Sequence, residues 1–364
     1  MPLYQAGDLN VDQLLASISE KAPIWQARGG DIERAGRMPE DLLQWIYELR
    51  LFKLMLPQEF GGRPTPLPDM LRIFEELAAI DGSLGWLVHI GAAGGYFAPS
   101  FEKEVARELF SPREAVIAGS GFPAGRARRT AGGYTVSGRW RYASGAQYAT
   151  LFTANAVCED EGKQVIRAFA FFPDQIQIVH DWGSFGLKAT ASDSMVVDEA
   201  FVPSERVFVV GESKWQPADP VTAALFRLPF DIVAVTTIAS VSIGLTRRFF
   251  ELARDLHRWE TLGHRQGLAR EAAEYRELYY LLARRAWSWA EAGHEFPERE
   301  KQAIMQGIRR LVAASVRAVQ EAFAYLGMRA LWETEPINRV YRDLQAASHH
   351  VFLRPPEAGE DTAG

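Results

Sequence analysis

The chain has 364 residues, of which 48% are hydrophobic and 24% are charged, and its formal net charge is -6. These values are typical of a globular protein with room for two or three domains, and a negative chain without a basic run excludes nucleic acid as the main partner. Cys158 is the single cysteine, which excludes a disulfide within the chain and a metal site built from several cysteines.

The sequence shows no pattern of a targeting or membrane-spanning segment. The first residues lack a basic region followed by an apolar core, which is the pattern of a secretory signal. The longest uncharged run, residues 232–246, falls short of the ~20 apolar residues that cross a bilayer, and a buried helix is the better interpretation. We therefore expect a cytoplasmic protein without a membrane partner.

Apolar residues at helical spacing predict an N-terminal α-helical domain over residues 1–113. One helix is expected to open at Asn10 and another after Pro39. A later helix is expected over residues 84–97, with Ser83 as its cap. That helix carries His89, and an isolated histidine in such a place is more often a hydrogen-bonded core residue than a catalytic one.

From residue 114 to 219 the periodicity changes to that of strands, which predicts a middle β-domain. Residues 132–148 are expected to form two short strands, with a glycine turn and a Ser-Gly break. They bring Trp140 and Tyr142 to a small-residue corner at Ala143-Ser144-Gly145. An aromatic wall with a hydroxyl at one edge suits a planar cofactor, although aromatic strands more often only pack a core.

Two further segments of the β-domain are predicted to be small-residue loops. The first, residues 118–125, contains Gly119, Ser120 and Gly125, and the second, residues 182–192, contains Thr190. Loops of this kind can bring backbone N–H groups close to a ligand. Neither matches the phosphate loop or the glycine pattern of a dinucleotide-binding βαβ unit, and each can also be read as a plain turn.

Long amphipathic segments predict a C-terminal helical bundle domain over residues 220–364. The expected helices cover residues 232–256, 270–292, 298–331 and 337–351, and the last carries two adjacent histidines. The order is helices, then a β-domain, then a bundle. The fold class is therefore α+β, mostly α.

Short motifs in this order resemble the acyl-CoA dehydrogenase superfamily. They are Leu56-Pro57-x-Glu59-x-Gly61-Gly62, Asp81-x-Ser83-x-Gly85-Trp86, the segment 119–145, Gly186-Leu187-Lys188-Ala189-Thr190, Val197-x-x-x-Phe201-Val202-Pro203 and Arg342-Asp343. The resemblance spans nearly the whole chain and implies an N-terminal helical domain, a middle β-barrel and a C-terminal four-helix bundle. It also implies a flavin between barrel and bundle and, commonly, a homotetramer in which a neighbouring subunit completes the cofactor site.

The base that a dehydrogenase of this family uses is missing from its usual places. Such an enzyme needs a carboxylate to remove the α-proton of a thioester while the flavin accepts a hydride. The resemblance implies a glutamate shortly after the Arg-Asp pair, where residues 344–351 contain no carboxylate. The family's alternative position falls near Ala253, and the neighbouring Glu251 and Asp255 point elsewhere on a helix.

The chain is more similar to the two-component flavin monooxygenases built on this fold. These take reduced flavin, FAD or FMN, from a separate NAD(P)H:flavin reductase and use O2 to oxygenate a small aromatic or related substrate. The resemblance implies that Ser144 stands beside flavin N5 to hold the oxygen adduct, and that His350 or its neighbour His349 takes a proton from the substrate. The residues that it implies for cofactor binding are Gly119, Ser120, Gly125, Tyr142, Ser144 and Thr190.

Three functions remain open from the sequence. The leading one is a flavin-dependent oxidoreductase that works as a two-component monooxygenase. The second is an acyl-CoA dehydrogenase or oxidase with a displaced base, and the third is a flavin-binding homologue that has lost its catalytic residues and serves as an assembly partner. The substrate, the choice between FAD and FMN, and the reductase stay undetermined.

Overall fold

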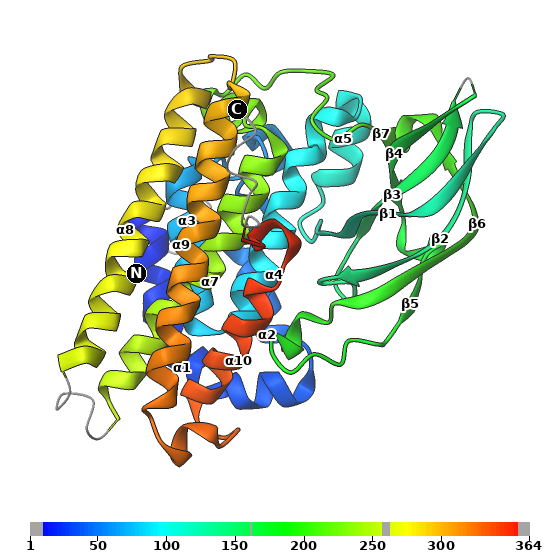
Figure 1. Cartoon of the computed structure of the whole chain (residues 1–364). Coiled ribbons are helices and arrows are strands. Elements are labelled where there is room, and N and C mark those ends of the chain that lie inside the picture. The colour runs from blue at the N-terminus through cyan, green and yellow to red at the C-terminus, as the bar shows by residue number, and fades with distance from the viewer. Residues whose placement is uncertain (1–9, 161, 257–262, 356–364) are drawn as a thin grey trace, which may run out of the picture.

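The computed structural model of the chain describes residues 10–160, 162–256 and 263–355. Figure 1 shows a body of long helices with a β-sheet to one side of it. Helices from both ends of the chain share one continuous hydrophobic core, and the sheet surrounds a second core of its own. The expected boundaries near residues 113 and 219 fall between the last helix of the first part and the first strand, and between the last strand and the next helix.

The N-terminal part is helical. Its elements are α1 (Val11–Ala35), α2 (Glu40–Glu48), α3 (Leu67–Ile80), α4 (Gly82–Ala93), the 3₁₀ helix η3 (Gly94–Ser100) and α5 (Lys103–Phe110). Asn10 caps α1 as expected, because its side chain accepts the N–H of Gln13 and Gln13 returns a bond to the Asn10 N–H.

The prediction that Ser83 caps the next helix is wrong. Asp81 is the cap of α4, since its carboxylate accepts the backbone N–H of Leu84, and Ser83 lies inside the first turn. The helix also ends at Ala93 instead of Phe97. The following residues tighten into η3, which contains Pro99, a residue that cannot continue an α-helix.

The middle of the chain forms one seven-stranded sheet with the order β5-β6-β2-β1-β3-β4-β7. The strands are β1 (Ile117–Thr130), β2 (Gly133–Ala143), β3 (Leu151–Asp160), β4 (Lys163–Phe171), β5 (Gln177–Val179), β6 (Asp193–Pro203) and β7 (Val207–Phe208). Among the strands of the described residues, β1 and β3 are the one pair that runs parallel. The sheet buries large aromatic side chains, among them Trp140, Phe152 and Phe169, in the second core.

Two local predictions in this sheet are wrong. Residues 133–143 form one strand, β2, and its hairpin partner is β1, so the Ser-Gly break is only a register shift between Val136 and Gly138. Residues 118–125 do not leave the sheet as a loop. They belong to β1, which bulges between Ser120 and Gly125.

The C-terminal part consists of α6 (Pro220–Arg227), α7 (Phe230–Arg254), α8 (Gly263–Glu291), α9 (Glu298–Ala324), the 3₁₀ helix η8 (Met328–Leu331) and α10 (Pro336–Ser348). The expected helix over residues 298–331 is interrupted, because Gly327 adopts φ 74° and ends the α-helical path. Among the described residues α7 is long and apolar enough to cross a membrane, but 83% of its most apolar stretch is buried inside the molecule. Packing accounts for its composition.

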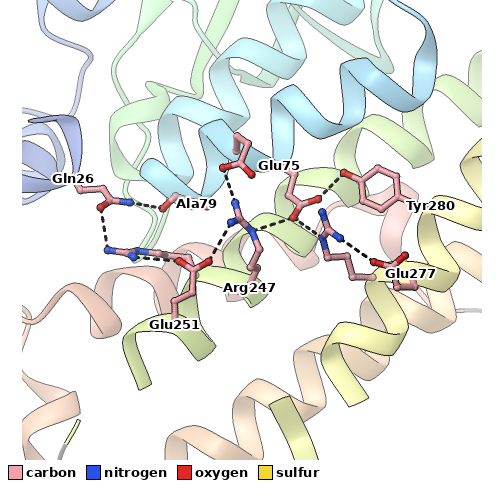
Figure 2. Close-up of polar contacts among 10 residues, drawn as sticks. Gln26, Glu75, Ala79, Arg247, Glu251, Glu277 and Tyr280 are labelled. Atoms are coloured by element: carbon pink, nitrogen blue, oxygen red, sulfur yellow. Dashed lines mark hydrogen bonds and ion pairs between the residues drawn. The ribbon is translucent and has the colours of Figure 1, made fainter. Parts of the chain in front are cut away.

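A buried carboxylate joins the two helical parts. Glu75 on α3 is 1% exposed, and Figure 2 shows it between Arg247 of α7 and Tyr280 of α8. Its Oε1 lies 3.0 Å from Nε of Arg247 and 2.7 Å from Nε of Arg276, and its Oε2 accepts the Tyr280 hydroxyl at 2.5 Å. A charge this deep in a core is stable only with such partners. Glu75 therefore fixes α3 against α7 and α8.

Candidate functional site

A chain of buried hydroxyl groups lies where the end of β2 meets α4. Ser144 follows β2 directly, and its Oγ accepts the indole N–H of Trp86 at 2.9 Å. The same oxygen lies 2.6 Å from Oγ of Ser192, which lies 2.7 Å from Oγ1 of Thr190. The Thr190 hydroxyl donates to the carbonyl of Leu187 at 2.8 Å. Ser144, which the sequence predicts to be at a reactive edge, is therefore one member of a continuous polar chain.

Local geometry explains why these side chains meet. Gly145 turns the chain after β2 with φ +80°, and a Cβ there would lie 2.8 Å from the Leu87 side chain of α4. Its N–H donates to the Thr190 carbonyl, which holds the corner of β2 against the segment that enters β6. The corner is made of small buried residues, and a hydroxyl at its edge is available to a flat ligand.

The two adjacent histidines at the end of α10 have different environments. His349 is exposed, and its Nδ1 bonds the Gln345 carbonyl one turn back at 2.7 Å. His350 turns inward, with its ring centroid 5.7 Å from that of Trp86. Burial lowers the pKa of His350 to about 4, so the imidazole is neutral at pH 7. Of the two, only His350 is brought next to the hydroxyl chain.

His89 on α4 is a second histidine in contact with Trp86. Its ring centroid is 5.0 Å from the Trp86 ring in an edge-to-face arrangement, and the side chain is 1% exposed. It is a core residue, as expected, but neither ring nitrogen has a hydrogen-bond partner. Burial, with a smaller effect of the His350 charge, lowers the pKa of His89 to about 3. The nearby backbone carbonyls of Gly85 and Trp86 oppose this only in part, because neither reaches a ring nitrogen in hydrogen-bonding geometry.

The α10 Arg-Asp pair docks the segment that carries Thr190 and Ser192. Asp343 Oδ1 accepts the backbone N–H of Leu187 at 2.6 Å, and Arg342 donates to the Phe185 carbonyl at 2.6 Å and to Glu33 of α1. A Cβ at Gly186 would lie 2.1 Å from the Arg342 carbonyl oxygen, so only glycine allows this approach. The last helix thus fixes both His350 and the far end of the hydroxyl chain.

The other four residues expected to bind a cofactor are not members of the hydroxyl chain. Gly125 faces the core of the sheet, since a Cβ on it would lie 2.1 Å from the Trp140 ring. Gly119 packs against Thr153 of the neighbouring strand, and Ser120 follows it in β1. Tyr142 is 65% exposed and touches Trp182 edge to face, with centroids 6.2 Å apart.

A cavity of about 510 Å³ adjoins the site. Its lining includes Trp182, Lys188 and Ala191. Ala191 lies between Thr190 and Ser192 in the chain, so the cavity and the hydroxyl chain share a wall. The Lys188 ammonium in the lining lies 3.6 Å from the Glu33 carboxylate of α1. The lining also contains the carboxylates of Glu33 and Asp193, so the cavity combines an aromatic side with charged groups of both signs.

Sequence reasoning missed Ser192 and gave no role to the side chain of Trp86. No strand-like signal in the sequence pointed to Ser192, because Thr190 ends a 3₁₀ turn and Ala191 adopts a left-handed conformation with φ 45°. The contact between Trp86 and Ser144 spans 58 positions of the chain and has no local signal.

The fold and the family models agree on the class of protein. The chain matches the model of the acyl-CoA dehydrogenase N-terminal domain over residues 22–101 and that of the acyl-CoA dehydrogenase C-terminal domain over residues 259–355. Both models describe domains of the acyl-CoA dehydrogenase superfamily, and the chain has the fold of these domains.

Within this superfamily the chain is similar to monooxygenases. It is 23% identical to the indole-3-acetate monooxygenase of Pseudomonas putida, over 90% of this chain and 87% of that protein. It is 25% identical to the oxygenase component of FADH2-dependent resorcinol hydroxylase from Rhizobium sp., over 94% and 90% of the two chains. The crystal structure of 3-HSA hydroxylase from Rhodococcus sp. RHA1 matches with a TM-score of 0.86 and 21% identity, covering 96% of this chain and 94% of the other.

Proposed function

We propose that this protein is a flavin-dependent oxidoreductase and, specifically, the oxygenase component of a two-component monooxygenase. It would take reduced FAD or FMN from a separate NAD(P)H:flavin reductase and use O2 to oxygenate a small aromatic or related substrate. The observation that carries the proposal is the buried cluster of Ser144, Trp86 and His350, which offers hydroxyl, indole and imidazole groups at the meeting point of β2, α4 and α10. The proposal is also supported by the similarity of the chain, over most of its length, to proteins named as a monooxygenase and a hydroxylase.

The residues present fit a reduced flavin. Bound there, the flavin supplies the two electrons and the site of oxygen activation. In this proposal the flavin ring would lie against the small, buried corner at Ala143–Ala146, with Ser144 at its edge. Tyr142 with Trp182 would form an aromatic side, and Lys188 in the adjoining cavity is a candidate contact for the flavin phosphate.

His350 would contact the substrate and handle its proton. The backbone N–H of Phe352 donates to its Nδ1 at 3.3 Å, so neutral His350 carries its proton on Nε2. Nε2 therefore offers an N–H to a substrate oxygen in this tautomer. Taking up the substrate proton, as a general base must, requires release of the long Phe352 bond.

The dehydrogenase alternative is less well supported, because the carboxylates of α4 and α10 have structural partners. Asp81 and Asp343 accept the backbone N–H groups of Leu84 and Leu187. Glu251 on α7 pairs with Arg247 and Arg248. None of these groups is left to remove the α-proton of a thioester.

The deciding experiment is anaerobic mixing of the protein with reduced FAD or FMN, followed by oxygen. We expect tight binding of reduced flavin and a delay in H2O2 release relative to free flavin, and Ser144→Ala should shorten that delay roughly tenfold or more, which corresponds to about one hydrogen bond to a charged or reactive group. Bleaching of bound flavin by an acyl-CoA, without any such delay, would establish the dehydrogenase instead. Absence of flavin binding would leave an inactive homologue.

The same proposal includes a cytoplasmic homotetramer. Support for self-association comes from exposed apolar side chains around η8, where Met328 is 74% and Trp332 is 62% exposed. Analytical ultracentrifugation of the purified chain tests it, and a monomer at micromolar concentration would refute it. The separate reductase is supported by the names of relatives that are oxygenase components.

A further inference from the structure

The proton positions in the buried hydroxyl chain follow from a count of donors. The Thr190 hydroxyl has one proton, and it is engaged by the Leu187 carbonyl, which can only accept. In the 2.7 Å bond between Thr190 and Ser192, the proton must therefore come from Ser192. That bond uses the single proton of Ser192.

The same count determines the role of Ser144. Since the Ser192 proton is engaged, Ser192 accepts in its 2.6 Å bond with Ser144, and Ser144 donates. The indole N–H of Trp86 can only donate, so Ser144 also accepts from it. Ser144 keeps one free lone pair and has no proton left for a ligand. All three hydroxyl residues are buried, which keeps bulk water from replacing these bonds.

We propose that this relay, Trp86 to Ser144 to Ser192 to Thr190, makes Ser144 an acceptor that selects the reduced form of the flavin. The proposal rests on the proposed function. Reduced flavin carries a proton on N5 and donates there, whereas N5 of oxidised flavin is an acceptor. Two acceptors facing each other in a buried site leave both without a partner, which is unfavourable.

Ser192, Thr190 and Trp86 are therefore positioning residues that act through Ser144. The relay begins at an N–H that cannot accept and ends at a carbonyl that cannot donate, so its direction does not reverse without breaking a bond. Asp343 holds the far end in place through the Leu187 N–H. The consequence is a site that binds the flavin when it arrives reduced and favours its release when oxidised.

The test compares dissociation constants of oxidised and reduced FAD and FMN under anaerobic conditions, by flavin fluorescence or equilibrium dialysis. The wild type should bind the reduced form more tightly. Ser192→Ala frees the Ser144 proton to donate to N5 of oxidised flavin. The dissociation constant of oxidised flavin divided by that of reduced flavin should therefore fall by about fivefold, the effect of one hydrogen bond. Thr190→Val removes the hydroxyl that accepts the Ser192 proton, so this ratio should fall as well. Thr190→Ser keeps that hydroxyl, so the ratio should stay at the wild-type value.

Ser194→Ala is the matched control. Ser194 is also buried and only two residues beyond Ser192, but its hydroxyl donates to Asp181 at 2.7 Å, outside the relay. The ratio should stay at the wild-type value in this variant. An unchanged ratio in both Ser192→Ala and Thr190→Val, or equal narrowing in Ser194→Ala, would overturn the relay and leave the proposed function standing. Failure of the wild type to bind either flavin would overturn both, and if Ser192→Ala does not fold, the Thr190 pair of variants decides.

Discussion

The indole ring of Trp86 contacts two histidines, His89 and His350, and the two differ in what their ring nitrogens contact. Burial lowers the pKa of both, to about 3 for His89 and about 4 for His350, so both are neutral at pH 7. His350 accepts a backbone N–H, whereas His89 has no hydrogen bond at either nitrogen. At the scale of single residues, the site therefore contains one imidazole with a defined tautomer and one that is held in the core without a polar partner.

A comparison of two asparagine variants separates the roles of His350 and His349. His350→Asn should lower coupled product formation by at least about a hundredfold, the usual contribution of a group that handles a proton, while the affinity for reduced flavin stays within a few fold. His349→Asn should keep activity, because that ring is exposed and bonded to its own helix. Product yield per flavin oxidised is the measurement, and equal losses in the two variants would refute the assignment.

His89→Leu should stabilise the protein by ~1 kcal/mol at pH 7, because it removes two buried polar atoms without partners. The pH dependence should also change. In the wild type the unfolded histidine gains a proton below pH ~6.5 while the folded one does so only near pH 3, so stability falls as the pH drops through this window. Urea unfolding at pH 7 and pH 5 measures both effects. A less stable variant at pH 7 would mean that His89 has a polar partner in solution.

At the scale of elements, α10 connects the helical body to the segment before β6. Burial and the neighbouring Asp81 carboxyl raise the pKa of Asp343 to about 8, so this side chain holds a proton at neutral pH while it accepts the Leu187 N–H. A Cβ at Gly82 would lie 2.7 Å from the Asp343 carboxylate, which shows how closely α4 and α10 approach. The contact orients His350 and Thr190 together.

Asp343→Asn should preserve this contact, because the amide oxygen can accept the same N–H. The folded wild type keeps a proton between pH ~4 and pH 8 that the unfolded chain has lost, so its stability falls as the pH rises through that window, by up to ~1.4 kcal/mol per pH unit. The variant should lose this dependence and be the more stable protein at pH 8. Thermal unfolding of both proteins at pH 5 and pH 8 measures this pH dependence. If the stability of the variant falls with pH as steeply as that of the wild type, the proton belongs to Asp81.

At the scale of the whole molecule, the N-terminal and C-terminal helices form one body, and Glu75 is the charged group at their junction. Its partners come from α7 and α8, more than 170 positions away in the chain. Figure 2 shows the carboxylate enclosed by these partners. The two helical parts are therefore coupled, although the β-domain separates them in sequence.

Glu75→Ala should lower the free energy of unfolding by ~3 kcal/mol or more, because it removes the carboxylate that Arg247 and Arg276 share at the edge of the core. Glu277→Ala is the control within the same network, because Glu277 bonds Arg276 at 3.0 Å but is 70% exposed, and its loss should cost less than ~1 kcal/mol. Denaturant midpoints of the two variants give the comparison. Similar losses would show that burial of the carboxylate does not matter.

The sequence by itself determined the features that depend on near neighbours. Helical and strand periodicity gave the three-part order, and Asn10 with Gln13 defined where α1 begins, because capping involves residues three positions apart. Local rules failed where more distant partners decided. Residues 118–125 look like a loop by composition, yet pairing with β3 keeps them in a strand. The cap of α4 is a local feature that was assigned to the wrong residue, since Asp81 and not Ser83 accepts the backbone N–H three positions on.

The candidate site was predictable in part. Motif order marked Ser144, Thr190 and His350. Only the tertiary structure joined Ser144 to Trp86 and Ser192. It also distinguished the environment of His350 from that of His349 and revealed that the ring nitrogens of His89 have no hydrogen-bond partner. The physical reason is that hydrogen-bond direction and burial belong to contacts across the fold. Each hydroxyl can donate once, and which neighbour receives that proton depends on all the groups that folding brings together.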